Sequence, residues 1–337
     1  MKIKEAIKLA ADKKNLDYEL ALGVMDEIMS GEATDIQMAA YLTAMSLKGE
    51  TIEEITASAA GMRKHCVKLL NEADVLEIVG TGGDYAQSFN ISTTSSIVVS
   101  AAGVPVAKHG NRASSSKSGS ADVLEALGVN ITIEPERSRD LLDEINLCFL
   151  FAQNYHLAMK YVAPVRRELG IKTIFNILGP LANPAGAKMQ LLGVYEEALI
   201  QPMAEVLMNL GVANAMVVFG QDGLDEISVS SDTSVCEIRG GFFKKYTIKP
   251  EDFGLKRWSK DEIVGGTPAE NAEITRAILR GDERGAKRDA VILNSAAAIY
   301  IAKPELSFEE AIKVATDTID SGKALAQLEE FVRLTNE

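Results

Sequence analysis

Hydrophobic residues in the first 70 positions recur at helical spacing, and polar helix-start signals separate the apolar stretches. The S/T-x-x-E/Q pattern that caps a helix start occurs at residues 34–37 and again at 51–54. Segment 36–47 is apolar over most of its surface, which is typical of a helix buried in a core or a subunit interface. We therefore predict a helical domain over residues 1–72 and a homodimer that forms through it.

From about residue 73 the pattern changes to short apolar runs, most of them bounded by Gly, Asn or charged residues. Helical stretches separate several of these runs, and strands that alternate with helices indicate an α/β domain with a mostly parallel central sheet. The predicted strands are 75–80, 104–110, 129–133, 146–152, 189–195 and 215–220. The predicted helices among them are 93–102, 119–127, 135–145 and 197–210.

Segment 156–186 interrupts this alternation, because it contains no clear strand and reads as helices that end in Gly-Pro and Asn-Pro turns. We expect it to return to the N-terminal helices and pack on them. The α/β domain would then consist of residues 73–155 and 187–337. Its C-terminal third begins with strand-like runs at 233–238 and 241–248 and then becomes helical.

A glycine-rich motif, Gly-Thr-Gly-Gly-Asp at 80–84, directly follows the first predicted strand. Glycines at a strand end let backbone N–H groups approach an anion closely. The dinucleotide-binding fingerprint would need a third glycine at position 85, which is Tyr85. The motif therefore indicates an anion-binding loop of another kind, with a plain tight turn as the alternative.

A second motif, Ser-Phe-Asn-Ile-Ser-Thr at 88–93, leads into an apolar helical run. Ser92 or Thr93 would lie at or just before the helix N-terminus, where free N–H groups form a ready anion site. Simple capping of the helix by these residues is the alternative interpretation.

A third motif, KHGNRASSSKSGS at 108–120, combines three cations with five hydroxyl groups in one predicted loop. No acidic residue occurs from Tyr85 to Ala121, whereas Lys108, Arg112 and Lys117 fall inside this stretch. Solvated polar loops usually contain acids as well, so the composition favours binding of a phosphate or diphosphate.

A fourth motif, Gly-Gln-Asp-Gly-Leu-Asp-Glu at 220–226, places three carboxylates after a predicted strand. The group is either a solvated turn or a set of ligands for Mg²⁺, which proteins hold with one or two carboxylates plus substrate phosphates. Each of the four motifs follows a strand or the loop from one, and in a parallel sheet such loops gather at one edge. Together they predict phosphate sites, cations and a metal site in one place.

The net charge of −13 opposes binding of nucleic acid. The chain has no apolar run of about 18 residues, so we expect no membrane span, and charges within the first 14 residues do not fit a secretory signal. The three cysteines, Cys66, Cys148 and Cys236, fit no zinc spacing and are expected to be reduced thiols of a cytoplasmic protein.

Familiar nucleophile patterns are missing from the sequence, including the G-x-S-x-G elbow. Of the three histidines only His109 lies in a proposed site, and we do not assign it as a general base. A reaction without a protein nucleophile must depend on placement and electrostatics.

At these motifs the sequence resembles the anthranilate phosphoribosyltransferase family of tryptophan biosynthesis. GTGGD, NIST, KHGNR, SGSADVLEALG, PVR-ELG-KTIFN-LGPL-NP and DGLDE occur in the expected order, and the resemblance covers essentially the whole chain. It implies a small helical domain with a larger α/β domain similar to nucleoside phosphorylases, a homodimer, and Mg²⁺ as cofactor. The implied reaction joins anthranilate to 5-phosphoribosyl 1-diphosphate and releases diphosphate.

The resemblance also implies roles for single residues. For the metal it implies Ser92, Asp225 and Glu226, and for anthranilate Gly80, Asn111 and Arg166. Arg166 suits a carboxylate because a guanidinium binds it bidentately, and Pro164 would lie in the first turn of the same helix. The implied donor-binding residues are Gly80, Gly83, Asp84, Ser88, Asn90, Ile91, Ser92, Thr93, Lys108, His109, Gly110, Asn111, Arg112, Ala113, Ser114, Ser115, Ser116 and Ser120.

Two other functions fit parts of the pattern. A nucleoside phosphorylase of the same fold would not need the Asp-Glu metal pair. A non-catalytic relative that binds nucleic acid would need a basic surface, which the net charge of −13 opposes.

Overall fold

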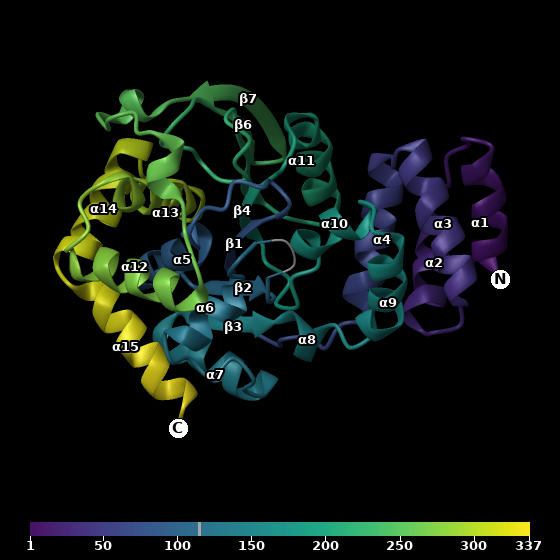
Figure 1. Ribbon diagram of the computed structural model, residues 1–337, viewed down its shortest axis with the longest axis horizontal. Coiled ribbons are helices and arrows are strands. Elements are labelled where there is room, and N and C mark those ends of the chain that lie inside the picture. Colours follow the sequence, from purple (N-terminus) through teal and green to yellow (C-terminus); the bar gives the residue numbers. More distant parts are fainter. Residues whose placement is uncertain (114–115) are drawn as a thin grey trace.

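The N-terminal part of the chain folds into helices that pack beside a larger α/β part (Figure 1). This computed structural model describes residues 1–113 and 116–337. Thr34 and Thr51 accept hydrogen bonds from the backbone N–H groups of Gln37 and Glu54, so both predicted capping boxes are present. The N-terminal helices are α1 (Lys2–Ala11), α2 (Tyr18–Met29), α3 (Asp35–Lys48) and α4 (Ile52–Lys64).

The segment after residue 156 returns to these helices. It forms α9 (Met159–Leu169), α10 (Phe175–Leu178) and a 3₁₀ turn, η1 (Gly179–Leu181). In Figure 1, α9 lies beside α2 and α3, and α10 lies next to α4. Apolar side chains of the segment share one core with α2, α3 and α4, and this core also takes in side chains of the α/β part such as Leu192 and Val217. Members of that shared core from the segment include Val162, Val165, Ile174, Phe175 and Leu178.

Pro164 was expected in the first turn of its helix, and this prediction was wrong. The helix α9 begins five residues earlier, at Met159, and Pro164 lies in its interior. A proline in a helix interior removes one backbone hydrogen bond and clashes with the preceding turn. The tertiary contacts of Val162 and Val165, which are buried on either side of Pro164, outweigh this cost.

The α/β part is built on a seven-stranded sheet with the order β3-β2-β1-β4-β5-β6-β7. The first five strands are parallel to their neighbours, whereas β6 and β7 are antiparallel, so the prediction of a mostly parallel sheet is confirmed. The strands are β1 (Leu76–Gly80), β2 (Val106–Gly110), β3 (Leu147–Phe151), β4 (Met189–Gly193), β5 (Asn214–Gly220), β6 (Thr233–Arg239) and β7 (Phe242–Ile248).

The strand predicted at 129–133 was wrong, because these residues form a turn. The Val129 N–H donates to the Leu124 carbonyl and so closes the preceding helix. The Asn130 side chain then accepts from the Thr132 N–H at 3.1 Å, a local bond typical of Asx turns. Val129 and Ile131 are buried all the same, so their alternating pattern reflects packing of a turn rather than a strand.

Helices cover both faces of the sheet, and alternate residues of each strand face different helices. Leu191 and Val218 pack with the cluster that contains α5 (Ile91–Ala101) and α13 (Ala286–Ala302). Leu192 and Val217 pack with α11 (Ile200–Asn209) and the N-terminal helices. The remaining α-helices are α6 (Ser120–Ala126), α7 (Pro135–Ile145), α8 (Ala152–Tyr155), α12 (Pro268–Arg280), α14 (Phe308–Asp320) and α15 (Lys323–Thr335).

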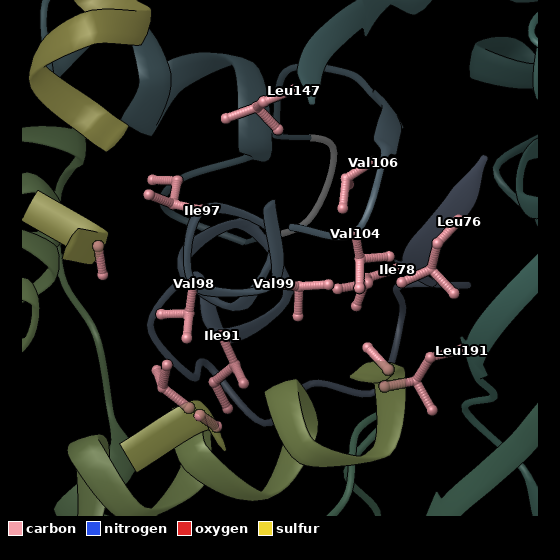
Figure 2. Packing of buried hydrophobic residues seen from close by; sticks show 14 of the residues in the cluster. Leu76, Ile78, Ile91, Ile97, Val98, Val99, Val104, Val106, Leu147 and Leu191 are labelled. Atoms are coloured by element: carbon pink, nitrogen blue, oxygen red, sulfur yellow. The ribbon is translucent and has the colours of Figure 1, made fainter. Parts of the chain in front are cut away.

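The helix α5 lies at the centre of this packing. Figure 2 shows Ile97, Val98 and Val99 pointing from it in different directions, each among apolar side chains. Some of its buried hydroxyl groups bond to carbonyls of the same helix, as the Ser96 hydroxyl does to the Ser92 carbonyl at 2.8 Å, and others bond to neighbouring helices, as the Ser95 hydroxyl does to the Val291 carbonyl. A helix packed on all sides holds its N-terminus in one place. Within the described residues, no helix has the length and apolar character that a membrane crossing needs.

Candidate active site

The four motifs meet at one cavity of about 560 Å³ beside the ends of β1, β2 and β5 and the N-terminus of α5. Every candidate site residue in the described part of the chain lines this cavity, including Arg166 from α9. Ser114 and Ser115, two of the residues implied for the donor, lie outside the described residues. The structure therefore brings together residues that are up to 146 positions apart, from Gly80 to Glu226.

Asp225 and Glu226 link three of the motifs. Asp225 is 9% exposed and Glu226 is 8% exposed, and both lie in the connection between β5 and β6. The Gly82 N–H donates to Asp225 Oδ2 at 2.7 Å, and the Ser92 N–H donates to Glu226 Oε1 at 3.2 Å. A Cβ atom on Gly80 would lie 2.3 Å from Asp225 Oδ2, so only glycine lets the strand end approach this carboxylate.

The electrostatics of this carboxylate pair favour a cation. Burial, followed by the nearby charges of Asp84 and Glu226, holds the pKa of Asp225 well above its usual range. Burial also raises the pKa of Glu226 to about 7. A divalent cation would relieve the repulsion among these carboxylates. Across residues 1–113 and 116–337, no set of three His, Cys, Asp or Glu side chains is arranged to hold a metal by itself. The pair therefore fits Mg²⁺ that is also held by ligand phosphates.

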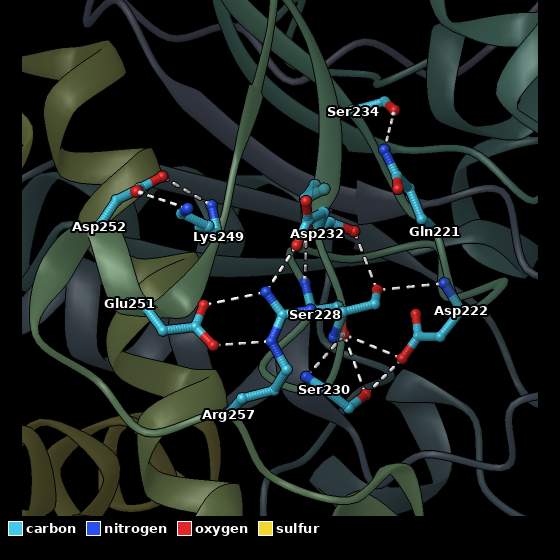
Figure 3. Close-up of polar contacts among 12 residues, drawn as sticks. Gln221, Asp222, Ser228, Ser230, Asp232, Ser234, Lys249, Glu251, Asp252 and Arg257 are labelled. Atoms are coloured by element: carbon cyan, nitrogen blue, oxygen red, sulfur yellow. Dashed lines mark hydrogen bonds and ion pairs between the residues drawn. The ribbon is translucent and has the colours of Figure 1, made fainter.

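A hydrogen-bond network fixes the connection that carries the pair (Figure 3). Asp222 accepts from the hydroxyl groups of Ser228, at 2.9 Å, and of Ser230. On the other side, the buried Asn294 of α13 both donates to the Ile227 carbonyl and accepts from the Ile227 N–H, each at 3.0 Å. The two carboxylates thus stand on a segment anchored from the loop side and from the core.

Lys108 falls in both the predicted strand 104–110 and the predicted phosphate-binding loop 108–120; it lies in the strand β2 and is only 3% exposed. Its Nζ donates to the Ile78 carbonyl at 2.7 Å and to Ser92 Oγ at 3.2 Å. Burial lowers the pKa of Lys108 to about 8, while the carboxylates nearby, chiefly Glu226, favour its charged form. Lys108 is therefore a buried cation next to Ser92 and the carboxylate pair and is not part of the solvated loop.

Arg112 does not stand in an acid-free environment, in contrast to the expectation from its loop. Its guanidinium pairs with Glu125 at 2.5 Å and with Asp122 at 3.0 Å, both on α6. Asp122 also accepts from the N–H groups of Ala113 and Gly119, at 2.8 and 2.9 Å, and so ties the loop to the start of α6. The acid-free stretch of sequence ends at Ala121, one residue before this carboxylate.

Arg166 also lines the cavity. It belongs to α9 and lies outside the four motifs in the sequence. Its guanidinium carbon is 5.6 Å from the centre of the Phe175 ring, and burial lowers its pKa. Half-buried beside an aromatic ring, this cation is suited to a planar carboxylate.

Several residues without a predicted role also line the cavity, among them His156, Phe175 and Pro180. The His109 and His156 rings lie 4.9 Å apart, and burial lowers the pKa of His109 to about 3 and of His156 to about 4. Both imidazoles are therefore neutral at pH 7. His156, Phe175 and Pro180 lie in segment 156–186, in which only Arg166 had a predicted binding role.

Comparisons with known proteins agree with this geometry. Residues 72–325 match the a/b domain of the glycosyl transferase family, and residues 4–66 match the helical bundle domain of the same family. An anthranilate phosphoribosyltransferase from Methanobrevibacter smithii is 66% identical over 334 residues, 99% of each chain. One from Lachnoclostridium phytofermentans is 64% identical over the same length and coverage.

Solved structures give the same result. The anthranilate phosphoribosyltransferase of Thermus thermophilus superposes with a TM-score of 0.94 at 44% identity, covering 98% of this chain and 99% of that one. The Saccharomyces cerevisiae enzyme, solved in complex with PRPP and Mg, superposes with a TM-score of 0.92 at 28% identity, covering 99% and 98%. From its sequence, its fold and the residues gathered at its cavity, this chain belongs to the anthranilate phosphoribosyltransferase family.

Proposed function

We propose that this protein transfers the 5-phosphoribosyl group of 5-phosphoribosyl 1-diphosphate to the amine of anthranilate in tryptophan biosynthesis. The products are N-(5-phosphoribosyl)anthranilate and diphosphate. The observation that carries the proposal is the meeting, in one cavity, of a buried carboxylate pair, a helix N-terminus and the separate cation Arg166. Anthranilate phosphoribosyltransferases that are 66% and 64% identical to this chain support the choice of donor and acceptor.

Mg²⁺ is the cofactor, and Asp225, Glu226 and Ser92 would hold it together with the phosphates of the donor. When bound, the ion supplies positive charge against the departing diphosphate. The burial and mutual repulsion of the two carboxylates fit this role. The yeast relative solved with PRPP and Mg offers the same pairing of donor and metal.

The donor would lie against the residues after β1 and β2 and at the N-terminus of α5. There the backbone of Gly83 and the Thr93 N–H in the first turn of α5 can face phosphate oxygens, since the Ile91 and Ser92 N–H groups are bonded to the Phe89 carbonyl and to Glu226. Lys108 adds a positive charge next to Ser92. Since Arg112 is paired with Asp122 and Glu125, its contribution to the donor requires that these ion pairs open or share it.

The acceptor would lie between the donor and α9, where Arg166 would bind its carboxylate and Gly80 and Asn111 would contact its ring and amine. The yeast relative has also been solved in complex with 4-fluoroanthranilate. We assign no general base, since the imidazoles that line the cavity are weakly basic. Placement of the arylamine near the ribosyl carbon is then the main contribution of the acceptor site.

We further propose a homodimer that forms through the helical domain. Ile36 and Leu47, at the two ends of α3, are 83% and 77% exposed in the single chain. Burial of such side chains in a partner removes apolar surface from water. Sedimentation should give the mass of a dimer at micromolar concentration, and a stable monomer there would contradict this assembly. The three free thiols also suit the cytoplasm.

The decisive experiment is product formation from 5-phosphoribosyl 1-diphosphate, anthranilate and Mg²⁺, followed by mass spectrometry. We expect diphosphate and phosphoribosylanthranilate in equal amounts. Phosphorolysis of a pyrimidine nucleoside without a divalent metal would instead indicate a nucleoside phosphorylase. A salt-dependent mobility shift with single-stranded DNA, without turnover, would indicate the nucleic-acid-binding alternative.

A further inference from the structure

The start of α12 and the segment before it pack against the wall of the candidate donor site. The Gly265 N–H donates to the Gln87 carbonyl at 2.9 Å, and the Phe89 N–H donates to the Ile263 carbonyl at 3.1 Å. A Cβ atom on Gly265 would lie 2.6 Å from Phe89 Cα, so this close approach requires glycine. Two segments that are about 175 residues apart in sequence are thus joined backbone to backbone.

Asn271 of α12 lies directly behind this wall and is 1% exposed. Its Oδ1 accepts from the Gly266 N–H at 2.7 Å, and its Nδ2 donates to Asn90 Oδ1 at 2.8 Å. Because a backbone N–H can only donate, the bond from Gly266 fixes which end of the Asn271 amide faces Asn90. Asn90 must therefore present its oxygen to Asn271.

Asn90 is the N-cap residue of α5, and an asparagine at this position usually accepts from an N–H of the first helical turn. Among the described residues, however, no backbone N–H of α5 is capped by the Asn90 side chain. Its Oδ1 is occupied by Asn271 and by the Ser118 hydroxyl, the latter at 3.1 Å, and its Nδ2 donates to the Ser118 carbonyl at 3.1 Å. The side chain that would cap the helix is held aside.

We propose that Asn271 is a positioning residue for the phosphoribosyl donor, which acts through Asn90. In the first turn of α5 the Ile91 N–H donates to the Phe89 carbonyl and the Ser92 N–H to Glu226 Oε1. By binding the Asn90 oxygen, Asn271 keeps the Asn90 side chain from capping the remaining N–H, that of Thr93, which can then face a phosphate group. Because the Asn90 side chain also bonds to the hydroxyl and the carbonyl of Ser118, fixing Asn90 fixes the end of the loop after β2 as well. Asn271 does not line the cavity, whereas Asn90 and Ser118 do. The inference rests on the proposed function, because the ligand it concerns is the donor.

The test compares two buried positions one turn apart on α12. Thr275 also joins α12 to α5, through a hydrogen bond of 2.9 Å between its hydroxyl and that of Thr94, but within the described part of the chain it makes no hydrogen bond to Asn90. With the full-length protein and Mg²⁺, Asn271→Ala should raise the KM for 5-phosphoribosyl 1-diphosphate roughly tenfold, the effect of about one lost hydrogen bond. The KM for anthranilate should change less than about twofold. Thr275→Val should leave both KM values unchanged.

A double-mutant cycle then separates positioning from general damage. In an Asn90→Ala background, Asn271→Ala should have no further effect on the donor KM, because the residue through which it acts is gone. If Asn271→Ala does not fold, Asn271→Ser takes its place, since a short hydroxyl remains near Gly266 but cannot reach Asn90.

Equal effects on donor and acceptor, an effect that persists without Asn90, or an unchanged donor KM would each overturn the inference. The unmodified protein is assayed in parallel. If it makes no product, the proposed function has failed; if it does and the variants show one of these three results, only the role of Asn271 has failed.

Discussion

Two connections contribute to the cavity and differ in how they are held: residues 221–232 between β5 and β6, and residues 81–90 between β1 and α5. In the first, all residues from Leu224 to Val229 are buried, and side chains from inside and outside the loop bond to its backbone. In the second, Gly82, Tyr85 and Gln87 are exposed, and four residues adopt the left-handed conformation, Gly82, Gly83, Tyr85 and Gln87.

The difference matches the two kinds of ligand. A metal needs carboxylates at fixed positions, and a hydrogen-bond network that forms without the ligand holds the β5–β6 connection that carries them (Figure 3). A phosphate group can bind to backbone N–H groups of a segment that has few buried contacts of its own. We infer that the carboxylate side is rigid, and that the glycine-rich side, which is tied to residues 263–265 at Gln87 and Phe89, gains further order from the donor.

The largest effect should come from removing the carboxylates themselves. In Asp225→Asn combined with Glu226→Gln, turnover should fall about a hundredfold or more, because a bound cation contributes several kcal/mol of charge stabilisation. Dependence on Mg²⁺ should weaken in the same variant, as measured by titration with metal after chelation. As a control, Asp232→Asn with Glu251→Gln removes two charges near Arg257, outside the cavity, and should retain activity. Full activity in the first variant would refute the metal assignment.

The second largest effect should come from removing Asn294, which anchors the connection 221–232 from the core side. Asn294→Ala leaves the buried N–H and carbonyl of Ile227 without their partner, at a cost of about 1–3 kcal/mol for each group. We expect the free energy of unfolding in urea to fall by about 2–4 kcal/mol. Ser295→Ala, the next residue on α13, should cost far less, since among the described residues its buried hydroxyl has no hydrogen-bond partner. Similar losses in both variants would mean that the anchor is not specific.

A third change tests a residue that belongs to neither connection. Arg166→Ala should raise the KM for anthranilate roughly ten- to a hundredfold, since a charge-assisted hydrogen bond contributes about 1.5–3 kcal/mol. The KM for the donor should change little, whereas Lys108→Ala should affect mainly the donor. The exposed neighbour Arg167, which does not line the cavity, is the control. Equal impairment of both substrates by Arg166→Ala would disprove separate sites.

The smallest effect is expected in the glycine-rich connection. Tyr85 has a φ of 55°, in the left-handed region that costs a non-glycine residue about 1 kcal/mol. Tyr85→Gly relieves this strain but raises the conformational entropy of the unfolded chain, which costs a similar free energy on folding. The free energy of unfolding should therefore change by less than about 1 kcal/mol. Leu70→Gly, at an exposed loop position without positive φ, has no strain to relieve and should be more destabilising. The reverse order would show that the loop is held in place by the Tyr85 side chain.

Much of the fold could be predicted from the sequence, because strand and helix periods were clear and capping residues marked the ends. The error at 129–133 arose because two apolar residues in alternate positions, Val129 and Ile131, are buried in a turn. Alternation alone does not distinguish a strand from a turn whose side chains face the core.

For the candidate site, the motifs gave the residues but not their environments. The sequence showed that Lys108 and Arg112 are cations, whereas only the fold shows that one is buried in β2 and the other is paired with α6. Asn271 and Asn294 could not be predicted, because a buried amide is recognised by the backbone groups it meets, and these come from distant segments.

The shared core of the N-terminal helices and the segment from α9 to η1 has a consequence for biosynthesis. During translation the first four helices emerge together, but Val162, Ile174 and Leu178, which complete their core, follow about a hundred residues later. Domains generally fold as units, beginning at the N-terminus while the chain is still growing. The N-terminal helices of this protein instead keep an incomplete apolar surface at least until η1 has left the ribosome, since the same core also contains residues of β4 to β6. A chaperone that binds nascent chains would meet that surface during this interval.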